Sequence, residues 1–378
     1  MPNAHHVYLN NLTPLRGMAA LWVAAYHFEI STIGSSHYDH SLLLGKGYLM
    51  VDLFFIMSGF IIRHVYGDSF SRRITIPDFR RFIVARFARI YPLHFFTLTF
   101  LIVMAFFTGE WNWVNDPNAI PTNLLLLQSF GVNRLSTWNR VSWSISAEWA
   151  AYMIFPLLAF LINRTPRITL PILPFLIILT YIALLYWLPP AGIGNADRLL
   201  LHKLDVTYDY GFLRGIAGFL VGMLCYGLYN QFPTRSFFSK DSMGMLCIAA
   251  TLLLMHKGSN DLFLIPAFSG LTVSFAANAG ILHKFCSFKP MQFVGKVSYS
   301  IYLIQAIAML FYTFVLEFSG LTGILPPLST TSFLPRLLYT ITYLVFLVGL
   351  SSATYYGVEN PCRNYINRNY LSKTPVMQ

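Results

Sequence analysis

Long apolar stretches follow one another along almost the whole chain, and this pattern constrains the fold more than any other feature. Only 11% of the 378 residues are charged, whereas 56% are hydrophobic. A soluble domain usually has about 25% charged residues, so a soluble fold of this chain would expose large apolar patches. A helix that crosses the hydrocarbon core needs about 20 residues. The expected spans lie at roughly 12–33, 44–66, 83–108, 142–163, 168–188, 208–230, 243–257, 261–281, 298–318 and 334–357.

One further apolar run, Ile120–Val132, is too short to cross and follows Pro117 and Pro121. Such a length favours a re-entrant or interfacial segment. If this run does not cross, about 17 of the 26 Lys and Arg residues share one side with both termini, and the positive-inside rule makes that side cytoplasmic. We therefore predict an all-α polytopic bundle of about ten spans with cytoplasmic N and C termini.

The chain is predicted to be a single membrane domain over residues 1–378. Its helical core covers about 12–357, and a short cytoplasmic C-terminal tail covers 358–378. The net charge of +11 could suggest a nucleic-acid partner. Because the basic residues lie between apolar runs, we expect them to set topology and contact phosphate groups instead. The expected partner is the lipid bilayer, and no nucleic acid is expected.

Ionisable residues inside the predicted spans are costly in lipid, and they usually face the interior of the bundle. A rise of about 1.5 Å per residue places His27, Asp52 and Glu148 at a similar depth, roughly 10 Å below the outer edge. The cationic residues near the inner edge are Arg16, Arg86 and Arg89. We therefore expect a cationic layer toward the cytoplasm and a layer of imidazole and carboxylates toward the outside.

This arrangement indicates a class of chemistry. A neutral imidazole can take a proton from a hydroxyl at physiological pH, and a carboxylate can orient it. Guanidinium groups bind phosphates through multidentate contacts. An activated carrier with a phosphorylated head and a long thin arm, such as acyl-coenzyme A, would reach both layers. The residues thus predict transfer of an acyl group to a hydroxyl, with the donor entering from the cytoplasm.

Simpler interpretations exist for the same residues. His27 could be a packed, hydrogen-bonded histidine, and His94 in mid-span could replace it as the base. Arg86 and Arg89 begin a span beside a cytoplasmic loop, so they could be anchors that snorkel to the membrane surface. The carboxylates Asp52 and Glu148 have no obvious partner on their own helices, which favours a functional role.

Two weaker patterns are set aside. His256 and Asp261 match the H-x-x-x-x-D pattern of glycerolipid acyltransferases, but two fixed positions often coincide by chance. His37, Asp39 and His40 lie close together in an outer loop without a fourth ligand. We predict no metal site.

At the same residues, six motifs in order resemble those of acyltransferase family 3, the membrane O-acyltransferases that modify bacterial surface sugars and some natural products. Each motif alone is weakly specific, whereas the ordered set is specific and extends from residue 12 to about 365. The motifs are Leu15–Ala20 with Val23 and His27, Val51–Phe60, Arg86–Pro92, Ser142–Trp149, Tyr299–Leu303 and Glu359–Pro361.

The resemblance implies roles for the matching residues. Arg16 and His27 would form the catalytic pair, with His27 as the base, although the estimated depths place Arg16 closer to the donor layer. Asp52 and Glu148 would shape or polarise the site. The residues implied to hold the donor are Arg86, Arg89 and Tyr91. Candidates for acceptor binding or positioning are Trp143, Ser144, Tyr302 and Gln305.

Gln305 departs from the family pattern, which often has a histidine shortly after the Tyr-Leu pair of the late motif. Gln can form hydrogen bonds but cannot titrate. If this position transfers protons, the chain has lost that step; if it positions a ligand, activity should persist.

The resulting hypothesis is a membrane O-acyltransferase of the bacterial inner (cytoplasmic) membrane. It would transfer an acyl group, expected to be acetyl, from acyl-CoA to a hydroxyl of a carbohydrate or glycolipid-linked acceptor. The main alternative is a secondary transporter or acyl-group exporter without bond-making chemistry. A transporter often shows repeated halves, and no repeat is evident. A non-catalytic scaffold would give no reason to place His27, Asp52 and Glu148 at one depth.

Overall fold

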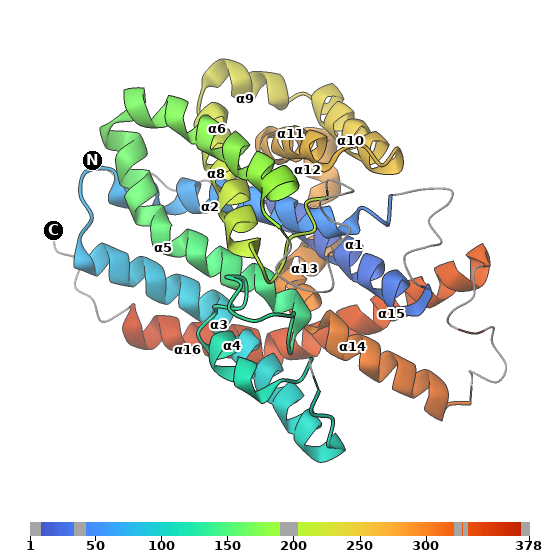
Figure 1. Cartoon of the computed structure of the whole chain (residues 1–378). Helices are drawn as coiled ribbons and strands as arrows, with labels where there is room; N and C mark the ends of the chain where they lie inside the picture. The colour runs from blue at the N-terminus through green and yellow to red at the C-terminus, as the bar shows by residue number, and fades with distance from the viewer. Residues whose placement is uncertain are drawn as a thin grey trace.

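The computed structural model describes residues 9–33, 43–112, 114–189, 203–320, 327 and 332–371, and among these residues it contains helices and no strand. The predicted all-α bundle is confirmed. Figure 1 shows α2 and α8 near the centre, with α1 beside them and the other helices around this group. The central helices are α1 (Leu12–Ile33), α2 (Met50–Tyr66) and α8 (Gly211–Tyr229).

The surrounding helices fall into long and short groups. The long ones are α3 (Ile76–Thr108), α5 (Trp143–Arg164), α6 (Pro166–Ile182), α14 (Ser298–Phe318) and α15 (Phe333–Thr354). Single π-helical turns follow α6 and α15, at Ala183–Trp187 and Tyr355–Glu359. The shorter helices are α4 (Ile120–Leu124), α9 (Phe232–Phe238), α10 (Asp241–His256), α11 (Leu264–Ala277), α12 (Ile281–Cys286), α13 (Lys289–Lys296) and α16 (Asn360–Tyr370).

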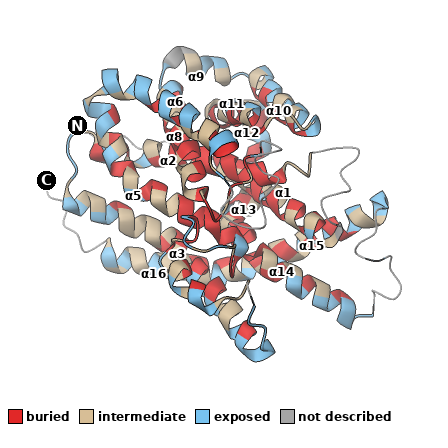
Figure 2. Ribbon diagram, in the orientation of Figure 1, coloured by how far each residue is buried: buried red, intermediate tan, exposed pale blue. Residues whose placement is uncertain are grey.

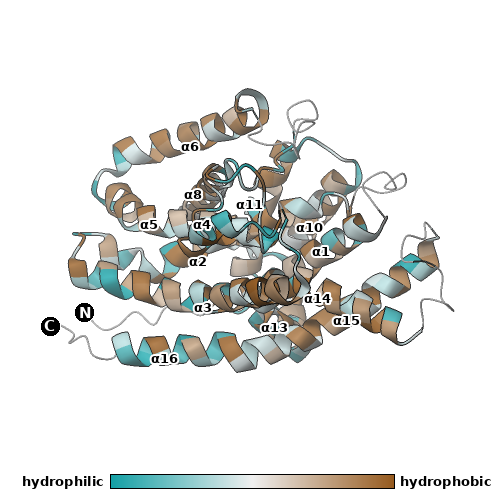
Figure 3. Cartoon of the chain, turned by 60° about the horizontal axis from the view of Figure 1, so that its bottom comes forward, coloured by the Kyte–Doolittle hydropathy of each residue, from teal (hydrophilic) through white to brown (hydrophobic). Residues whose placement is uncertain are grey.

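The burial pattern is that of a membrane bundle. Buried residues concentrate on the central helices (Figure 2), whereas apolar residues colour much of α6 and α15 (Figure 3). Phe175 on α6 is 64% exposed and Val345 on α15 is 70% exposed. Such a surface needs lipid around it. Seven helical stretches in the described part are long and apolar enough to cross a membrane, and two shorter apolar helices accompany them. The total of ten spans and the cytoplasmic termini stay predictions.

Most element boundaries agree with the apolar runs, and two differences have local causes. Helix α3 begins at Ile76 instead of residue 83, because the Thr75 side chain caps it by accepting the Asp78 N–H at 3.3 Å. This polar first section does not belong to the apolar run. In the segment predicted not to cross, the α-helix is only five residues long. The chain leaves it at Leu126, whose φ is 57°.

The predicted C-terminal tail is helical over much of its length. Helix α16 continues from α15 through the π-helical turn and runs beside α3 (Figure 1). Glu359, at the end of that turn, is 1% exposed. This part of the chain therefore packs against the bundle, and the assignment of residues 1–378 to one domain stays a prediction.

Helices α2 and α8 approach each other closely, and two glycines permit it. A Cβ atom at Gly59 would overlap the backbone carbonyl of Phe219, and one at Gly222 would overlap that of Ile56. Small residues at such crossings let helix backbones approach closely in membranes. The two positions are reciprocal, so each helix has a glycine against the other's backbone.

A buried ion pair links the same two helices. Arg214 on α8 donates to Asp52 on α2 through Nε at 3.0 Å and through Nη2 at 2.6 Å. Both side chains are fully buried. The remaining Arg214 hydrogen bonds go to the carbonyls of Val206 and Tyr48, at 3.2 and 3.0 Å. A buried charge pair is tolerated only when its hydrogen bonds are satisfied in this way.

The glycine crossing leads to a stability prediction. Gly222→Ala should lower stability by about 1–3 kcal/mol or more, because the added methyl group forces two backbones apart. The thermal unfolding midpoint of the purified protein in detergent measures the loss. Gly227→Ala is the matched control on the same helix, since a Cβ atom there meets nothing within 4 Å. Equal midpoints for the two variants would contradict the close crossing.

The ion pair leads to a second stability prediction. Asp52→Leu should destabilise the protein by about 3–5 kcal/mol, because Arg214 would remain charged and buried without its partner. The double variant Asp52→Leu/Arg214→Leu should be more stable than either single variant, since it leaves no unpaired charge. Unfolding midpoints of the four proteins form the test. A double variant whose loss equals the sum of the single losses would argue against a coupled pair.

Candidate active site

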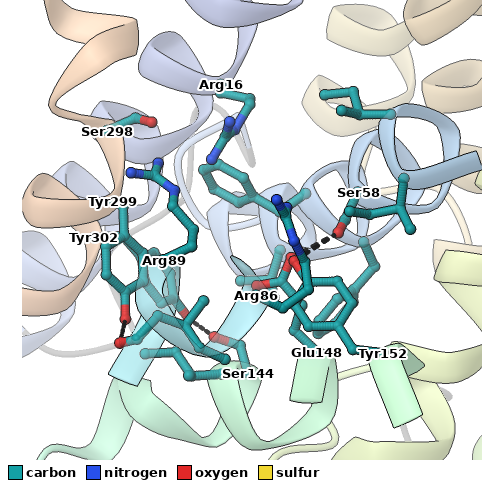
Figure 4. A pocket seen from close by; sticks show the side chains of 17 residues that line it. Arg16, Ser58, Arg86, Arg89, Ser144, Glu148, Tyr152, Ser298, Tyr299 and Tyr302 are labelled. Atoms are coloured by element: carbon teal, nitrogen blue, oxygen red, sulfur yellow. Dashed lines mark hydrogen bonds between the residues drawn. The ribbon is translucent and has the colours of Figure 1, made fainter. Parts of the chain in front are cut away.

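A small cationic cavity of about 110 Å³ lies among α1, α2, α3, α5 and α14. Figure 4 shows the side chains that surround it. Its charged lining residues are Arg16, Arg86, Arg89 and Glu148. Three guanidinium groups around one carboxylate leave this cavity with an excess of positive charge. We call it the cationic cavity.

The three arginines are not equivalent. Arg89 forms an ion pair with Glu359 and lies over the Tyr299 ring, with its guanidinium carbon 5.3 Å from the ring centre. Arg86 donates to the Tyr66 hydroxyl at 3.2 Å, and its buried Nε has no hydrogen-bond partner. Arg16 has no hydrogen bond or salt bridge to any described residue. Arg16 and Arg86 therefore keep hydrogen-bond donors that no described residue uses, and Arg86 and Arg89 line a cavity instead of acting only as surface anchors.

Glu148 belongs to the cationic cavity, which corrects the predicted depth. Its Oε1 accepts hydrogen bonds from Ser58 and Tyr152, both at 2.6 Å. The predicted layer placed Glu148 beside His27, but the two residues line different cavities. Counting residues gives depth only along a helix that is normal to the membrane, whereas tilt and lateral position depend on packing.

A larger cavity of about 730 Å³ lies beside the first one. We call it the imidazole cavity, because His27 lines it. Aromatic side chains form part of its wall, including Tyr26 and Trp143, and a short loop contributes Asp205. Its lining also includes the polar or charged residues Arg140, Arg214 and Gln305.

The hydrogen bonds of Gln305 fix the tautomer of His27. The Gln305 amide nitrogen donates to the Tyr302 carbonyl at 2.7 Å, so its Oε1 is the atom that faces His27. This oxygen can only accept, and it lies 2.9 Å from His27 Nδ1. Nδ1 therefore carries the proton in the neutral ring, and Nε2 has the lone pair. Such a ring can accept a proton from a hydroxyl in the cavity.

Tyr302 and Val51 separate the two cavities, because both residues line each of them. The Tyr302 hydroxyl donates to the Val141 carbonyl at 3.1 Å and accepts from Ser144 at 2.8 Å. Ser144 lines the cationic cavity, and the ring of Tyr302 is buried. Ser144 and Tyr302, both predicted site residues, therefore contact each other, and Tyr302 forms part of the wall between the two cavities.

Arg16 and His27 do not form a contacting pair. They lie eleven positions apart on α1, which corresponds to about 16 Å along the helix, and each lines a different cavity. Arg16 groups with the arginines of the cationic cavity, as its estimated depth indicated. The pair implied by the family resemblance can therefore act on one reaction only through a ligand that extends across both cavities.

Three other candidates lie outside both cavities. Asp52 is fully buried and holds Arg214, which lines the imidazole cavity. The Tyr91 hydroxyl donates to the Leu124 carbonyl at 3.1 Å, so this residue is not brought to the expected donor site. His94 is buried with Nε2 at 2.9 Å from the Asn123 carbonyl, where it supports the segment that includes α4. This placement favours His27 over His94 as the base.

Three lining residues of the imidazole cavity were not predicted from the sequence: Arg140, Asp205 and Arg214. Arg214 lies inside the run 208–230, and an ionisable residue in a span is a signal that could have identified it as the partner of Asp52. Asp205 precedes the same run in a loop, and no local pattern marks it. Burial raises the pKa of Asp205, and the charges of Arg214 and His27 oppose this rise.

Metal ligands were not predicted, and the candidate cluster His37, Asp39 and His40 lies outside the described residues. Within the described ranges, no group of three or more His, Cys, Asp or Glu side chains is arranged to hold a metal ion.

Comparison with known proteins identifies the family of the chain. A family model described as an acyltransferase domain matches residues 9–356. The chain is 33% identical to the acyltransferase MdmB of Streptomyces mycarofaciens over 167 residues, 42% of this chain and 41% of MdmB. It is 23% identical to the peptidoglycan O-acetyltransferase OatA of Listeria monocytogenes, over 78% of this chain and 48% of that protein. It is 25% identical to the O-acetyltransferase OatA of Staphylococcus aureus, over 78% of this chain and 50% of that protein.

The chain spans about half the length of the curated relatives it matches. No solved structure matches it significantly. The family match nevertheless covers nearly the whole chain, including every described residue that lines the two cavities. This match favours the acyltransferase hypothesis over the alternative of a transporter. The chain belongs to acyltransferase family 3, whose acyltransferase domain covers residues 9–356, and it is an integral membrane protein.

Proposed function

We propose that this protein transfers an acyl group, acetyl in the simplest case, from acyl-CoA to a hydroxyl of a carbohydrate or glycolipid-linked acceptor. The bacterial cytoplasmic membrane is its proposed location. The observation that carries the proposal is the pair of adjacent cavities, one with guanidinium groups whose donors are partly unused and one with an oriented imidazole, which share Tyr302 and Val51 in their linings.

The donor is assigned to the cationic cavity. Arg16 and the Nε atom of Arg86 have hydrogen-bonding capacity that no described residue uses. Phosphate oxygens are suitable acceptors for such groups. A volume of about 110 Å³ admits a phosphate or a thin chain but not a nucleotide. The nucleotide head would therefore remain outside the cavity, on the predicted cytoplasmic side, while the acyl-bearing arm extends inward.

The acceptor is assigned to the imidazole cavity. Its volume of about 730 Å³ lies within the usual range for small-molecule sites. Its lining combines aromatic rings with charged and amide groups, which suits a sugar with apolar faces and many hydroxyls. The curated relatives whose names specify O-acetylation, one of them on peptidoglycan, support an acceptor of this class.

The proposed reaction is a direct transfer. The acceptor oxygen attacks the thioester carbonyl carbon, and its proton passes to Nε2 of His27. The new C–O ester bond forms as the C–S bond breaks. The coenzyme leaves as a thiolate and takes the proton back from the imidazolium, which restores neutral His27. Gln305 keeps Nδ1 protonated throughout, so the same nitrogen accepts and returns the proton.

The roles of base and donor site can be separated by experiment. Purified protein in nanodiscs is given radiolabelled acetyl-CoA and a mixture of bacterial glycans. His27→Ala should lower transfer by about 10²–10⁴-fold, the usual contribution of a general base, and should still bind CoA. Arg16→Gln should weaken CoA binding, because it removes an unpaired guanidinium from the cationic cavity.

Arg164→Gln is the control for removal of a positive charge, since Arg164 is exposed at the end of α5. Retained transfer in His27→Ala would exclude His27 as the base. Unchanged CoA binding in Arg16→Gln would move the donor away from the cationic cavity. Well-folded wild-type protein that neither binds nor turns over acetyl-CoA would contradict the proposed donor.

Tyr302 gives a test of the partition. Tyr302→Ala should join the two cavities and let water from the imidazole cavity reach the thioester. We expect acetyl-CoA hydrolysis without acceptor to rise relative to transfer with acceptor. Tyr302→Phe keeps the ring but removes both hydrogen bonds of the hydroxyl. Its ratio of hydrolysis to transfer should lie closer to that of the wild type. A ratio that is the same in all three proteins would show that Tyr302 does not separate donor from water.

A further inference from the structure

Asp205 lies at the centre of a tightly held turn at the wall of the imidazole cavity. The Val206 N–H donates to the Leu204 carbonyl at 2.7 Å, which closes the turn around Asp205. The side chains of Leu204 and Val206 are fully buried, whereas the side chain of Asp205 lines the cavity. The chain is thus anchored on both sides of this one carboxylate.

Two buried ion pairs hold the turn in place. On one side, the Leu204 N–H donates at 2.7 Å to Asp261, which also forms an ion pair with Lys46. On the other side, the Val206 carbonyl accepts from Arg214 at 3.2 Å, and Arg214 is paired with Asp52. Three segments distant in sequence therefore converge to fix the backbone at Asp205.

The Asp205 carboxylate itself has no hydrogen bond or salt bridge to a described residue. Arg214 is close, but its four hydrogen bonds go to Asp52, Val206 and Tyr48. His27 faces the same cavity, but its Nδ1 is already bonded to Gln305. Asp205 therefore does not occupy the position of a carboxylate that orients the imidazole. Its oxygens remain available to a ligand in the cavity.

We propose that Asp205 binds the acceptor, accepting hydrogen bonds from two neighbouring hydroxyls of a polyhydroxylated molecule and thereby presenting a further hydroxyl to His27. This inference rests on the proposed function and adds the acceptor's recognition group. A carboxylate offers two oxygens side by side, which matches two adjacent hydroxyls. The cavity also supplies the aromatic side chains of Tyr26 and Trp143 for the apolar face of a sugar ring. A simple alcohol could make only one of these contacts.

The experiment measures how the acetyl group partitions among competing nucleophiles. Full-length protein in nanodiscs receives radiolabelled acetyl-CoA together with methyl α-mannopyranoside, which has adjacent hydroxyls, or 1-propanol, which has one. Hydrolysis by water is recorded in the same reactions. The wild type should favour the glycoside. Asp205→Asn should raise the KM for the glycoside by about ten- to hundredfold, as expected for loss of a charged hydrogen-bonding group.

Because 1-propanol has one hydroxyl, the preference for the glycoside over 1-propanol should fall in Asp205→Asn, and the unfolding midpoint of the variant shows whether it is folded. Glu317→Gln is the matched control, because Glu317 is an exposed carboxylate outside both cavities. Asp205→Glu should recover part of the glycoside preference.

The remaining outcomes also decide the question. An unchanged glycoside KM in Asp205→Asn overturns the proposal. A kcat that falls equally for the glycoside and 1-propanol, with KM unchanged, would mean that Asp205 acts on His27 instead of the acceptor, and this also overturns it. Wild-type protein that hydrolyses acetyl-CoA without preferring the glycoside refutes the polyol site but keeps the donor chemistry. Absence of both hydrolysis and transfer refutes the proposed function itself.

Discussion

Helices α2 and α8 touch backbone to backbone, and a buried ion pair joins them beside that contact. Much of the site depends on this pair of helices. From α2, Ser58 reaches Glu148 in the cationic cavity. From α8, Arg214 reaches the carbonyls of Tyr48 and Val206 at the edge of the imidazole cavity. The close crossing therefore joins a helix that lines the cationic cavity to a helix that lines the imidazole cavity, and the ion pair connects that crossing to the loops around the second cavity.

The two cavities would serve two opposed requirements of the proposed acyl transfer. The proposed donor is anionic and would be held by positive charge, whereas a general base works only while its imidazole is neutral. Arg16 and Arg86 line one cavity, and His27 lines the other. Arg140 and Arg214 share the cavity of His27, and the charge of Arg214 is balanced by its ion pair with Asp52. The thin arm of the proposed donor then bridges a distance that a compact substrate could not.

Much of the fold could be predicted from the sequence, because apolar runs mark helices that face lipid. The predicted boundaries of α1 and α14 agree with the structure to the residue. The grouping of polar residues could be predicted only in part. The cationic cavity contains the three arginines expected there, Arg16, Arg86 and Arg89. Glu148 also lines this cavity, and Asp52 forms an ion pair with Arg214, neither of which was expected. Which residues of different helices come into contact depends on which helices pack together. The packing of α2 against α8 depends on two glycines, and a hydropathy profile of the sequence does not reveal such a crossing.

The position of Gln305 shows why residue type alone was ambiguous there. As a replacement for histidine it suggested the loss of a proton-transfer step. In the structure its amide is fixed by the Tyr302 carbonyl, so that its oxygen can only accept from His27 Nδ1. A histidine at this position could exchange a proton with His27, whereas a glutamine cannot. In the proposed reaction the proton taken from the acceptor must therefore leave through Nε2 to the departing thiolate. The substitution is thus compatible with activity, and it confines proton transfer to the face of His27 on which donor and acceptor meet.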